Sequence, residues 1–451
     1  MKNRYTSIFN LYLADRIVLT SHHDRNARRR HSKKPHVTKR NQFIAPKQES
    51  LIVSKTLPPL RLKKNEERRL KAGHLWIYSN EVDTDKTPLK DFTPGMAVSV
   101  EDAQGHVLGN AYVNPHSLIS ARLVSRDTKY VLDQSLITHR LNIALSLREQ
   151  CFAQPFYRLV HGEGDNLPGL VVDRFADVLV VQITTAGMEI QKQAVVAALE
   201  KTLKPTAIIF RNDSPSRKAE KLDSYIETVS GTLSGPVLLE ENNTRFDIDV
   251  LAGQKTGWFY DHRMNRARMR HYVKGKRVLD VFSYIGGWGV QALTAGANEV
   301  MCIDTSAKAV DCIHHNASLN NAEDKLVSIE GDAFEALKSL RHERERFDVV
   351  IVDPPAFIKR KKDFKEGLTA YRRINQMALQ ILNKGGYLVS ASCSFHLKRE
   401  QLHDTILKAS RHIDRNAQII EQGHQGPDHP VHAAIAETDY LKAFIIRILS
   451  N

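Results

Sequence analysis

The chain has 451 residues, 42% of them hydrophobic and 26% charged, which suits about two to four folded domains and excludes a disordered chain. Its four cysteines are scattered, and no CxxC pair or HExxH motif occurs, so we expect neither a disulfide framework nor a metal site. No apolar stretch approaches the roughly 18 residues of a membrane helix, so we expect a reduced, soluble, cytoplasmic protein without membrane contact.

Residues 1–57 are predicted to form a basic head without regular structure. The first 50 residues hold twelve Lys and Arg against three acids, so they carry +9 of the net charge of +14. Such a segment either binds a polyanion or is a solvated tail, and a mitochondrial presequence is a weaker third interpretation because no amphipathic period occurs. Since Met96 is the next methionine after Met1, translation could also begin at a non-Met codon near residue 50.

Residues 58–130 show short apolar segments with alternating polarity, separated by turns. This rhythm predicts a small β-barrel. Basic residues stand at its start, followed by Trp76, and we assign RNA binding to four of them: Lys63, Lys64, Arg68 and Arg69. A basic stretch next to an aromatic side chain suits nucleic acid, although a short helix with a solvated basic face is the alternative interpretation.

Residues 131–240 are predicted to form a central α+β domain. Helical patterns cover residues 132–150 and 192–203, and strand patterns cover residues 178–184 and 207–210. The glycine-rich stretch at residues 161–174 is interpreted as a turn that leads into a strand. It lacks the spacing of a phosphate-binding loop, so we assign no nucleotide to it.

Residues 241–451 alternate between strand and helix patterns with little interruption. The predicted strands cover residues 277–283, 299–305, 326–331, 347–353, 386–392 and 440–449. The predicted helices cover residues 307–319, 368–382 and 399–410. This alternation predicts a doubly wound α/β sheet of the Rossmann-like class, which binds its ligand at the carboxyl ends of the strands.

Acidic residues follow successive strands of this predicted sheet. The first strand contains Asp280 and runs into a turn with Ser283, Gly286 and Gly287, where the backbone can approach a ligand closely. The next strand ends at Asp304, 24 residues later, which is where doubly wound folds place the acceptor for ribose hydroxyls.

The two following strands also end in acids. Asp332 is placed to reach an adenine amino group, and Asp353 begins the sequence DPPAF, in which Pro354 also borders the ligand. This order of acids matches the class I methyltransferases that use S-adenosyl-L-methionine. Because a sulfonium cofactor has no phosphate and carries a positive charge, an acidic pocket suits it better than it suits NAD, the alternative ligand.

The strand predicted at residues 386–392 is followed by Cys393, a candidate nucleophile. C5 of a pyrimidine is too weak a nucleophile to attack a methyl group unaided. A thiolate that adds to C6 makes C5 enamine-like, and a base later removes the C5 proton. Cys302 and Cys312 fall inside a predicted strand and helix, where a buried structural thiol is the usual interpretation.

With these residues assembled, residues 58–451 resemble the bacterial large-subunit (23S) ribosomal RNA 5-methylcytosine methyltransferase I family. The matching motifs are QKTGWFYDHR at residues 254–263, the four acids, SCS at residues 392–394, PDHP at residues 427–430, and NPHS at residues 114–117 with Arg122. The resemblance implies a PUA domain, a central domain and a class I methyltransferase domain at residues 241–451. It further implies methyl transfer from S-adenosyl-L-methionine to C5 of a cytidine, with Cys393 as nucleophile. Since Asp353 is expected one strand over from Cys393, we expect it to hold the flipped base.

Two departures from the family pattern leave alternatives open. Ile285 stands where the family usually has threonine, and residues 355–356 offer no second cysteine to help release the product. The base that removes the C5 proton therefore stays open among Glu437, Asp428, His429 and Asp439. The alternative functions are methylation of a guanine nitrogen without a nucleophile, and a non-catalytic RNA-binding protein. The PUA-type module could serve RNA contact or formation of a homodimer.

Overall fold

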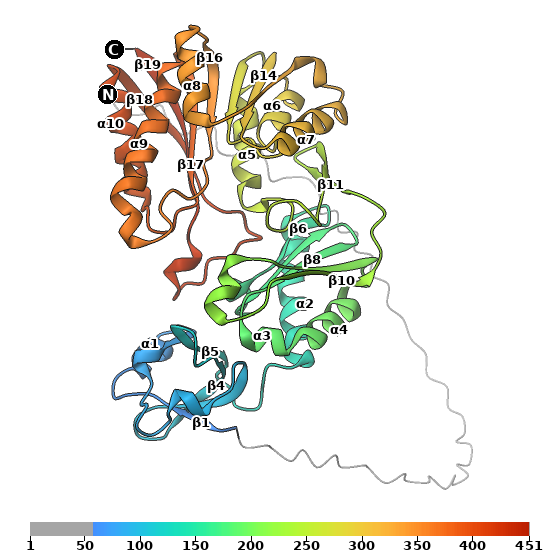
Figure 1. Ribbon diagram of the computed structural model, residues 1–451, viewed down its shortest axis with the longest axis vertical. Helices are drawn as coiled ribbons and strands as arrows, with labels where there is room; N and C mark the ends of the chain where they lie inside the picture. The colour runs from blue at the N-terminus through green and yellow to red at the C-terminus, as the bar shows by residue number, and fades with distance from the viewer. Residues whose placement is uncertain (1–56, 451) are drawn as a thin grey trace, which may run out of the picture. The chain divides into compact units, whose positions relative to one another are not determined.

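The computed structural model describes residues 57–450, except for the side chain of Ser450. The predicted basic head and the start near residue 50 lie outside the described residues, apart from Leu57. The described chain belongs to one compact unit that contains three sheets and one separate hairpin (Figure 1). No helix between residues 57 and 450 combines the length and the apolarity needed to cross a membrane.

The first sheet has five strands in the order β1-β3-β4-β5-β2. They are β1 Pro59–Arg61, β2 Trp76–Tyr78, β3 Met96–Glu101, β4 Val107–Val113 and β5 Ile119–Ser125. Alternate apolar residues such as Ile77, Val98 and Leu123 face one core, as the sequence pattern predicts. The basic stretch forms only the short helix α1 Glu67–Lys71, whose Leu70 anchors it to that core.

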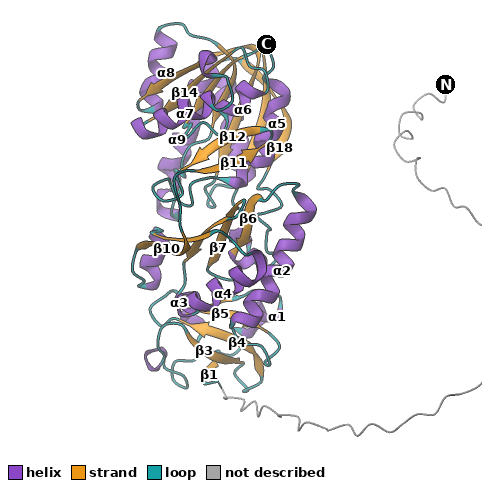
Figure 2. Cartoon of the chain, turned by 90° about the vertical axis from the view of Figure 1, so that its right-hand side faces the viewer, coloured by secondary structure: helices purple, strands orange, loops and turns teal. Residues whose placement is uncertain are grey.

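The second sheet also has five strands, in the order β10-β9-β8-β7-β6. They are β6 Phe156–His161, β7 Leu170–Phe175, β8 Val178–Ile183, β9 Ala207–Asn212 and β10 Tyr225–Gly231. Three helices accompany them: α2 Gln134–Cys151, α3 Ala186–Ile190 and α4 Lys192–Leu203. Helices α2 and α4 lie side by side and share one core with the strands (Figure 2). Strands β6 and β10 were not predicted from the sequence.

The third sheet has seven strands in the order β15-β14-β13-β16-β17-β19-β18. They are β13 Arg277–Val281, β14 Glu299–Asp304, β15 Leu326–Glu330, β16 Phe347–Val352, β17 Leu382–Ser392, β18 Arg415–Gly423 and β19 Lys442–Ser450. The first five run parallel, and β19 is antiparallel to both of its neighbours. The predicted doubly wound sheet is therefore confirmed, with the unpredicted strand β18 at its edge.

Helices cover both faces of this sheet. Side chains alternate along each strand, so Val278 packs with one set of helices and Leu279 with the other. The first set is α5 Arg263–Met269, α6 Gly289–Thr294 and α7 Ala307–Ser318. The second set is α8 Ala333–His342, α9 Phe364–Gln380 and α10 Arg399–His412.

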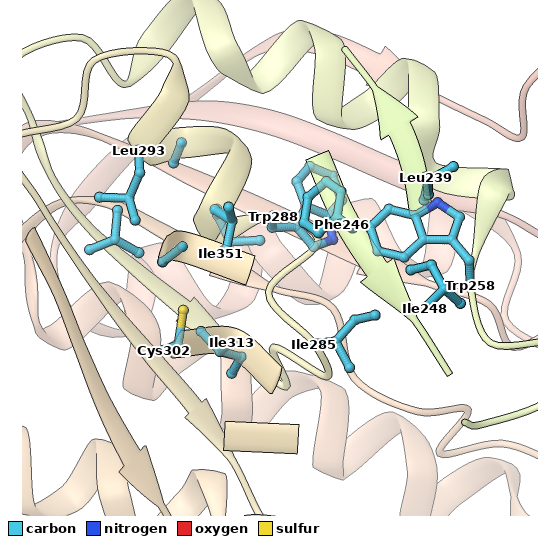
Figure 3. Close-up of a cluster of buried hydrophobic side chains, with 14 of the residues drawn as sticks. Leu239, Phe246, Ile248, Trp258, Ile285, Trp288, Leu293, Cys302, Ile313 and Ile351 are labelled. Atoms are coloured by element: carbon cyan, nitrogen blue, oxygen red, sulfur yellow. The ribbon is translucent and has the colours of Figure 1, made fainter. Parts of the chain in front are cut away.

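A hairpin of β11 Val237–Glu241 and β12 Thr244–Ile248 packs beside the sheet. Its Phe246 contacts Trp258 at 4.7 Å between ring centroids, and both belong to the core cluster that includes Trp288 (Figure 3). The fully buried Glu241 accepts a hydrogen bond from the indole Nε1 of Trp258 at 2.9 Å. The segment after the hairpin is thereby fixed against the carboxyl ends of β13 and β14.

Candidate active site at the carboxyl ends of the strands

A cavity of about 390 Å³ lies at the carboxyl ends of β13, β14, β16 and β17. Its lining combines aromatic, acidic and small residues: Gln254, Lys255, Trp258, Phe259, Asp261, His262, Arg266, Phe282, Ser283, Tyr284, Gly287, Trp288, Asp304, Thr305, Asp353, Pro354, Pro355, Ala356 and Cys393. Five predicted ligand residues, Ser283, Gly287, Asp304, Asp353 and Pro354, therefore meet in one cavity with Cys393.

Asp304 fixes the turn that follows β13. One carboxylate oxygen accepts a hydrogen bond from the backbone N–H of Tyr284 at 2.8 Å, and the other accepts from Ser306 N at 3.1 Å. Tyr284 has a φ of 51°, a left-handed conformation that this bond helps to hold. A carboxylate has about four acceptor positions, so Asp304 keeps capacity for ligand hydroxyl groups.

Asp280 does not line the cavity but binds the end of the segment that joins β13 to α6. Its fully buried carboxylate accepts a hydrogen bond from Gly289 N at 2.9 Å, and its second oxygen has no partner. Burial, reinforced by the charges of Asp353 and Asp304, raises the pKa of Asp280 to about 7. Gly286 also lies outside the lining, but its φ of 86° and the 2.7 Å between an added Cβ and Val290 require glycine there.

Asp332 lies outside the cavity lining. It is exposed, and it caps helix α8 by accepting hydrogen bonds from Phe334 N at 2.9 Å and Glu335 N at 3.1 Å. An acid after a strand thus has a structural explanation here, because a carboxylate satisfies free N–H groups at a helix start. Its predicted contact with adenine stays a prediction.

Asp353 is held by two neighbouring side chains. One oxygen accepts a hydrogen bond from Trp288 Nε1 at 3.0 Å, and the other lies 3.3 Å from Nε2 of the buried His262. Burial opposes the charge of Asp353, but the charge of His262 and these contacts hold its pKa below its usual range. Asp353 is therefore a carboxylate in the cavity wall whose two oxygens are already engaged.

Cys393 directly follows β17, and hydroxyl groups hold the turn around it. Ser392 donates to Tyr371 Oη at 2.8 Å, and Tyr371 Oη lies 2.9 Å from Oγ of Ser394. The buried ammonium of Lys442 donates to the carbonyl oxygen of Ser394 at 2.7 Å. Burial and the charge of Asp353 raise the pKa of the Cys393 thiol to about 11, so in this environment the thiol is protonated near neutral pH.

Comparisons with known proteins show the family of this chain. The sequence matches the family described as S-adenosylmethionine-dependent methyltransferase over residues 157–444, and a PUA-like domain over residues 60–126. The chain belongs to the S-adenosylmethionine-dependent methyltransferase family. Proteins called ribosomal RNA large subunit methyltransferase I, from Enterobacter sp. (strain 638) and from Escherichia coli (strain SMS-3-5 / SECEC), are each 36% identical over 397 residues, which is 86% of this chain and 99% of theirs.

Solved structures agree with the fold. A crystal structure of a methyltransferase complexed with SAH has a TM-score of 0.75 at 20% identity, and it covers 87% of this chain and 100% of its own. A SAM-dependent methyltransferase from Streptococcus mutans has a TM-score of 0.73 at 19% identity with the same coverage. The predicted class, a Rossmann-like methyltransferase fold after a PUA-like β domain, is therefore confirmed.

The cofactor of this methyltransferase is S-adenosyl-L-methionine, and the cavity suits it. Gly287 lets the chain pass close to Trp258, since an added Cβ would lie 3.2 Å from the indole ring. Asp304 and Asp353 provide negative charge at one cavity wall, whereas Trp258, Phe282 and Trp288 provide apolar surface. Such a combination fits a nucleoside that carries a cationic sulfonium.

The four candidate bases of the methyltransferase differ in their surroundings. Glu437 and Asp439 are exposed, and they line neither this cavity nor a second cavity of about 400 Å³ that adjoins it. Asp428 is fully buried and accepts a hydrogen bond from Arg158 N at 3.1 Å, while its other oxygen lies 2.9 Å from Nδ1 of His429. Of these four, His429 alone lines a cavity, the one described below.

The four predicted RNA-binding residues do not form one set. Lys63, Lys64 and Arg68 are exposed. Arg69 is half-buried, with 3.0 Å between its guanidinium and Glu81, and its guanidinium carbon lies 4.8 Å from the ring centroid of Tyr78. Arg69 therefore has partners within the first domain, and its predicted contact with RNA stays a prediction.

Several lining residues were missed by the sequence reasoning, and most belong to residues 254–266. Residues 254–263 of that stretch enter the sequence prediction only through the family resemblance, although their aromatic and basic side chains next to Asp261 are a signal for a binding site. Trp288 was also missed, since only the glycines of its turn were considered. Tyr284 was not predicted either; its hydroxyl accepts a hydrogen bond from Gln254 N at 3.0 Å and so links the two segments.

Proposed function

We propose that this methyltransferase forms 5-methylcytosine in large-subunit ribosomal RNA through a covalent adduct on Cys393. The observation that carries the proposal is the presence of Cys393 and Asp304 in the walls of one cavity. The relatives named ribosomal RNA large subunit methyltransferase I support the choice of substrate. That substrate implies a cytoplasmic location.

The cofactor supplies an electrophilic methyl group on a cationic sulfonium. The Cys393 thiolate adds to C6 of the cytosine, and the electron pair of the C5–C6 double bond then forms the new bond from C5 to the methyl carbon. The bond from that carbon to the sulfonium sulfur would break at the same time, and its electron pair would stay on the sulfur as a neutral thioether leaves. A base next removes the C5 proton, the double bond re-forms and the thiolate leaves. His429 is the predicted base that lines a cavity, so it is the base that we propose.

The pKa of Cys393 bears directly on the first step. A thiol with a pKa of about 11 is a poor nucleophile at neutral pH. The ammonium of Lys255, which lines the same cavity, lowers the pKa of Cys393. A bound sulfonium adds a second positive charge, so we expect Cys393 to ionise mainly in the cofactor complex.

We also propose a role for each domain. Residues 58–130 bind RNA with Lys63, Lys64 and Arg68, residues 131–240 form a central domain, and residues 241–451 form the methyl-transfer domain. A flipped-out target base costs a few kcal/mol of unstacking, which favours RNA that is exposed or partly assembled. Formation of a homodimer stays a prediction.

The test is the substitution Cys393→Ala, assayed by nucleoside mass spectrometry of ribosomal RNA after incubation with the protein and cofactor. We expect cofactor binding to be unchanged and 5-methylcytosine formation to fall by on the order of 10⁴-fold or more, because one member of a catalytic unit is lost. Full methylation by Cys393→Ala would contradict the adduct. A methylated guanine as the product would favour the alternative function.

A further inference from the structure

A second cavity of about 400 Å³ adjoins the cofactor cavity and shares three lining residues with it: Lys255, Phe259 and Asp261. Its other walls come mainly from the second sheet and from the segment between β18 and β19, which contributes His429 and Tyr440. Its volume lies within the range of small-molecule sites. The motif at residues 254–263 thus lies between two cavities, and the second one contains His429, the proposed base.

Asp261 stands at the boundary of these cavities with one oxygen free. Its side chain is deeply buried, since the residue is only 8% exposed. One carboxylate oxygen accepts a hydrogen bond from the Tyr440 hydroxyl at 2.7 Å. The other oxygen, Oδ1, is buried and has no hydrogen-bond partner. A buried polar atom without a partner is costly, so it marks a place for a ligand donor.

Neighbouring positive charges keep Asp261 ionised. Burial raises its pKa, but the charges of His262, His429 and Lys255 more than offset that effect and hold the pKa well below its usual range. An ionised carboxylate only accepts hydrogen bonds. The group that meets Oδ1 must therefore be a donor.

The surroundings suit an uncharged aromatic ring. Phe259, Tyr260 and Tyr440 line the second cavity, and the rings of His161 and His429 lie 4.9 Å apart there. His161 Nδ1 is a second buried atom without a partner. Asp353, by contrast, does not line the second cavity.

We propose that the second cavity holds the target nucleoside and that Asp261 Oδ1 accepts a hydrogen bond from the exocyclic amino group of its base. This inference rests on the proposed function and makes Asp261 the residue that separates cytosine from uracil. Cytosine presents an N4 amino donor, whereas uracil presents the O4 acceptor at the same position. The carbonyl oxygen of uracil would face a buried carboxylate and leave it unpaired, the situation in which sites discriminate most strongly.

The substitution Asp261→Asn tests this role because asparagine keeps an oxygen for the Tyr440 hydroxyl and presents an amino group to the base. The substrates are ribosomal RNA transcripts with cytidine or uridine at the methylated position, after that position has been mapped. We expect kcat/KM on the cytidine transcript to fall at least 100-fold, and the preference for cytidine over uridine to fall by a similar factor, with little change in the affinity for S-adenosyl-L-methionine.

Two further variants control this experiment. Asp324→Asn makes the same chemical change at an exposed position and should leave activity as it is. Tyr440→Phe removes the donor to the other oxygen of Asp261, so it should lower kcat/KM by about tenfold while cytidine remains preferred. Thermal unfolding with and without cofactor checks that each variant is folded.

Wild-type kcat/KM and wild-type base preference in Asp261→Asn would overturn the inference. So would accumulation of a covalent complex between Asp261→Asn and unmodified RNA, because that result would assign Asp261 to removal of the C5 proton. Failure of the wild-type protein to form 5-methylcytosine would instead overturn the proposed function itself, before any variant is compared.

Discussion

The active-site wall around Cys393 and the basic stretch at residues 63–69 differ in how their charges are held. Asp304 and Asp353 are fixed by backbone N–H groups or by neighbouring side chains in a cavity. Lys63, Lys64 and Arg68 are instead exposed, and Lys63 and Arg68 make their hydrogen bonds at the surface. A charge held in a low-dielectric cavity acts strongly on a particular ligand atom, whereas exposed charges act weakly and are screened by salt. We therefore expect large, specific effects from the first region and small, salt-dependent effects from the second.

The largest expected effect concerns the reactivity of Cys393 in the absence of cofactor. Because burial and Asp353 raise its pKa to about 11, the reactive thiolate is scarce near neutral pH. Its rate of alkylation by iodoacetamide should rise about tenfold per pH unit from pH 7 to 10, as the thiolate fraction does below a thiol's pKa. Mass spectrometry of the Cys393 peptide measures that rate. A rate that levels off below pH 9 would contradict the raised pKa.

Cofactor affinity should separate two acids that the sequence pattern treats alike. Asp304→Ala removes the carboxylate that holds Tyr284 N and faces the ligand, so we expect S-adenosyl-L-methionine to bind about 10- to 100-fold more weakly. Asp332→Ala removes a helix cap and should cost about 1 kcal/mol of stability with a smaller change in affinity. Isothermal titration calorimetry and thermal unfolding measure both. An equal loss of affinity in Asp332→Ala would support its predicted contact with adenine.

The smallest effects should come from the basic stretch. Changing Lys63, Lys64 and Arg68 to Glu should weaken RNA binding several-fold and reduce the slope of log affinity against log salt by about 1 for each lost phosphate contact. Filter binding at several salt concentrations measures the slope. Arg69→Gln is the matched control, since its ion pair with Glu81 suggests a change in stability and an unchanged slope. An unchanged slope in the triple variant would make these residues a solvated face.

The sequence predicted those parts of the molecule that follow from local periodicity. Alternation of strand and helix patterns placed the parallel strands, and the ends of parallel strands gave Asp304, Asp353 and Cys393. Strand β18 was missed because it lies at the edge of the sheet and carries few apolar residues, so its pattern resembles a loop. A prediction from strand ends also could not separate Asp304, which faces the cavity, from Asp332, which caps a helix.

Contacts between distant segments could not be predicted from local sequence patterns. Residues 254–263 line the cavity because the hairpin β11–β12 packs Trp258 against Phe246, a tertiary contact with no local signature. In the sequence, Arg69 cannot be distinguished from its basic neighbours, whereas the structure places Glu81 and Tyr78 beside it. Arg122 of the first sheet, which matched a family motif, likewise contacts a distant segment: it forms a buried ion pair at 2.9 Å with Glu220, which lies between β9 and β10.

The most direct test of the central claim is the reaction of the wild-type protein with ribosomal RNA that contains 5-fluorocytidine. Fluorine at C5 cannot leave as a proton does, so the methylated adduct cannot resolve. In the presence of S-adenosyl-L-methionine we predict a stable protein–RNA complex, with the nucleotide attached to Cys393 in peptide mass spectra, and no complex with Cys393→Ala. Methylation of unmodified RNA without any trapped complex on Cys393 would contradict the covalent mechanism.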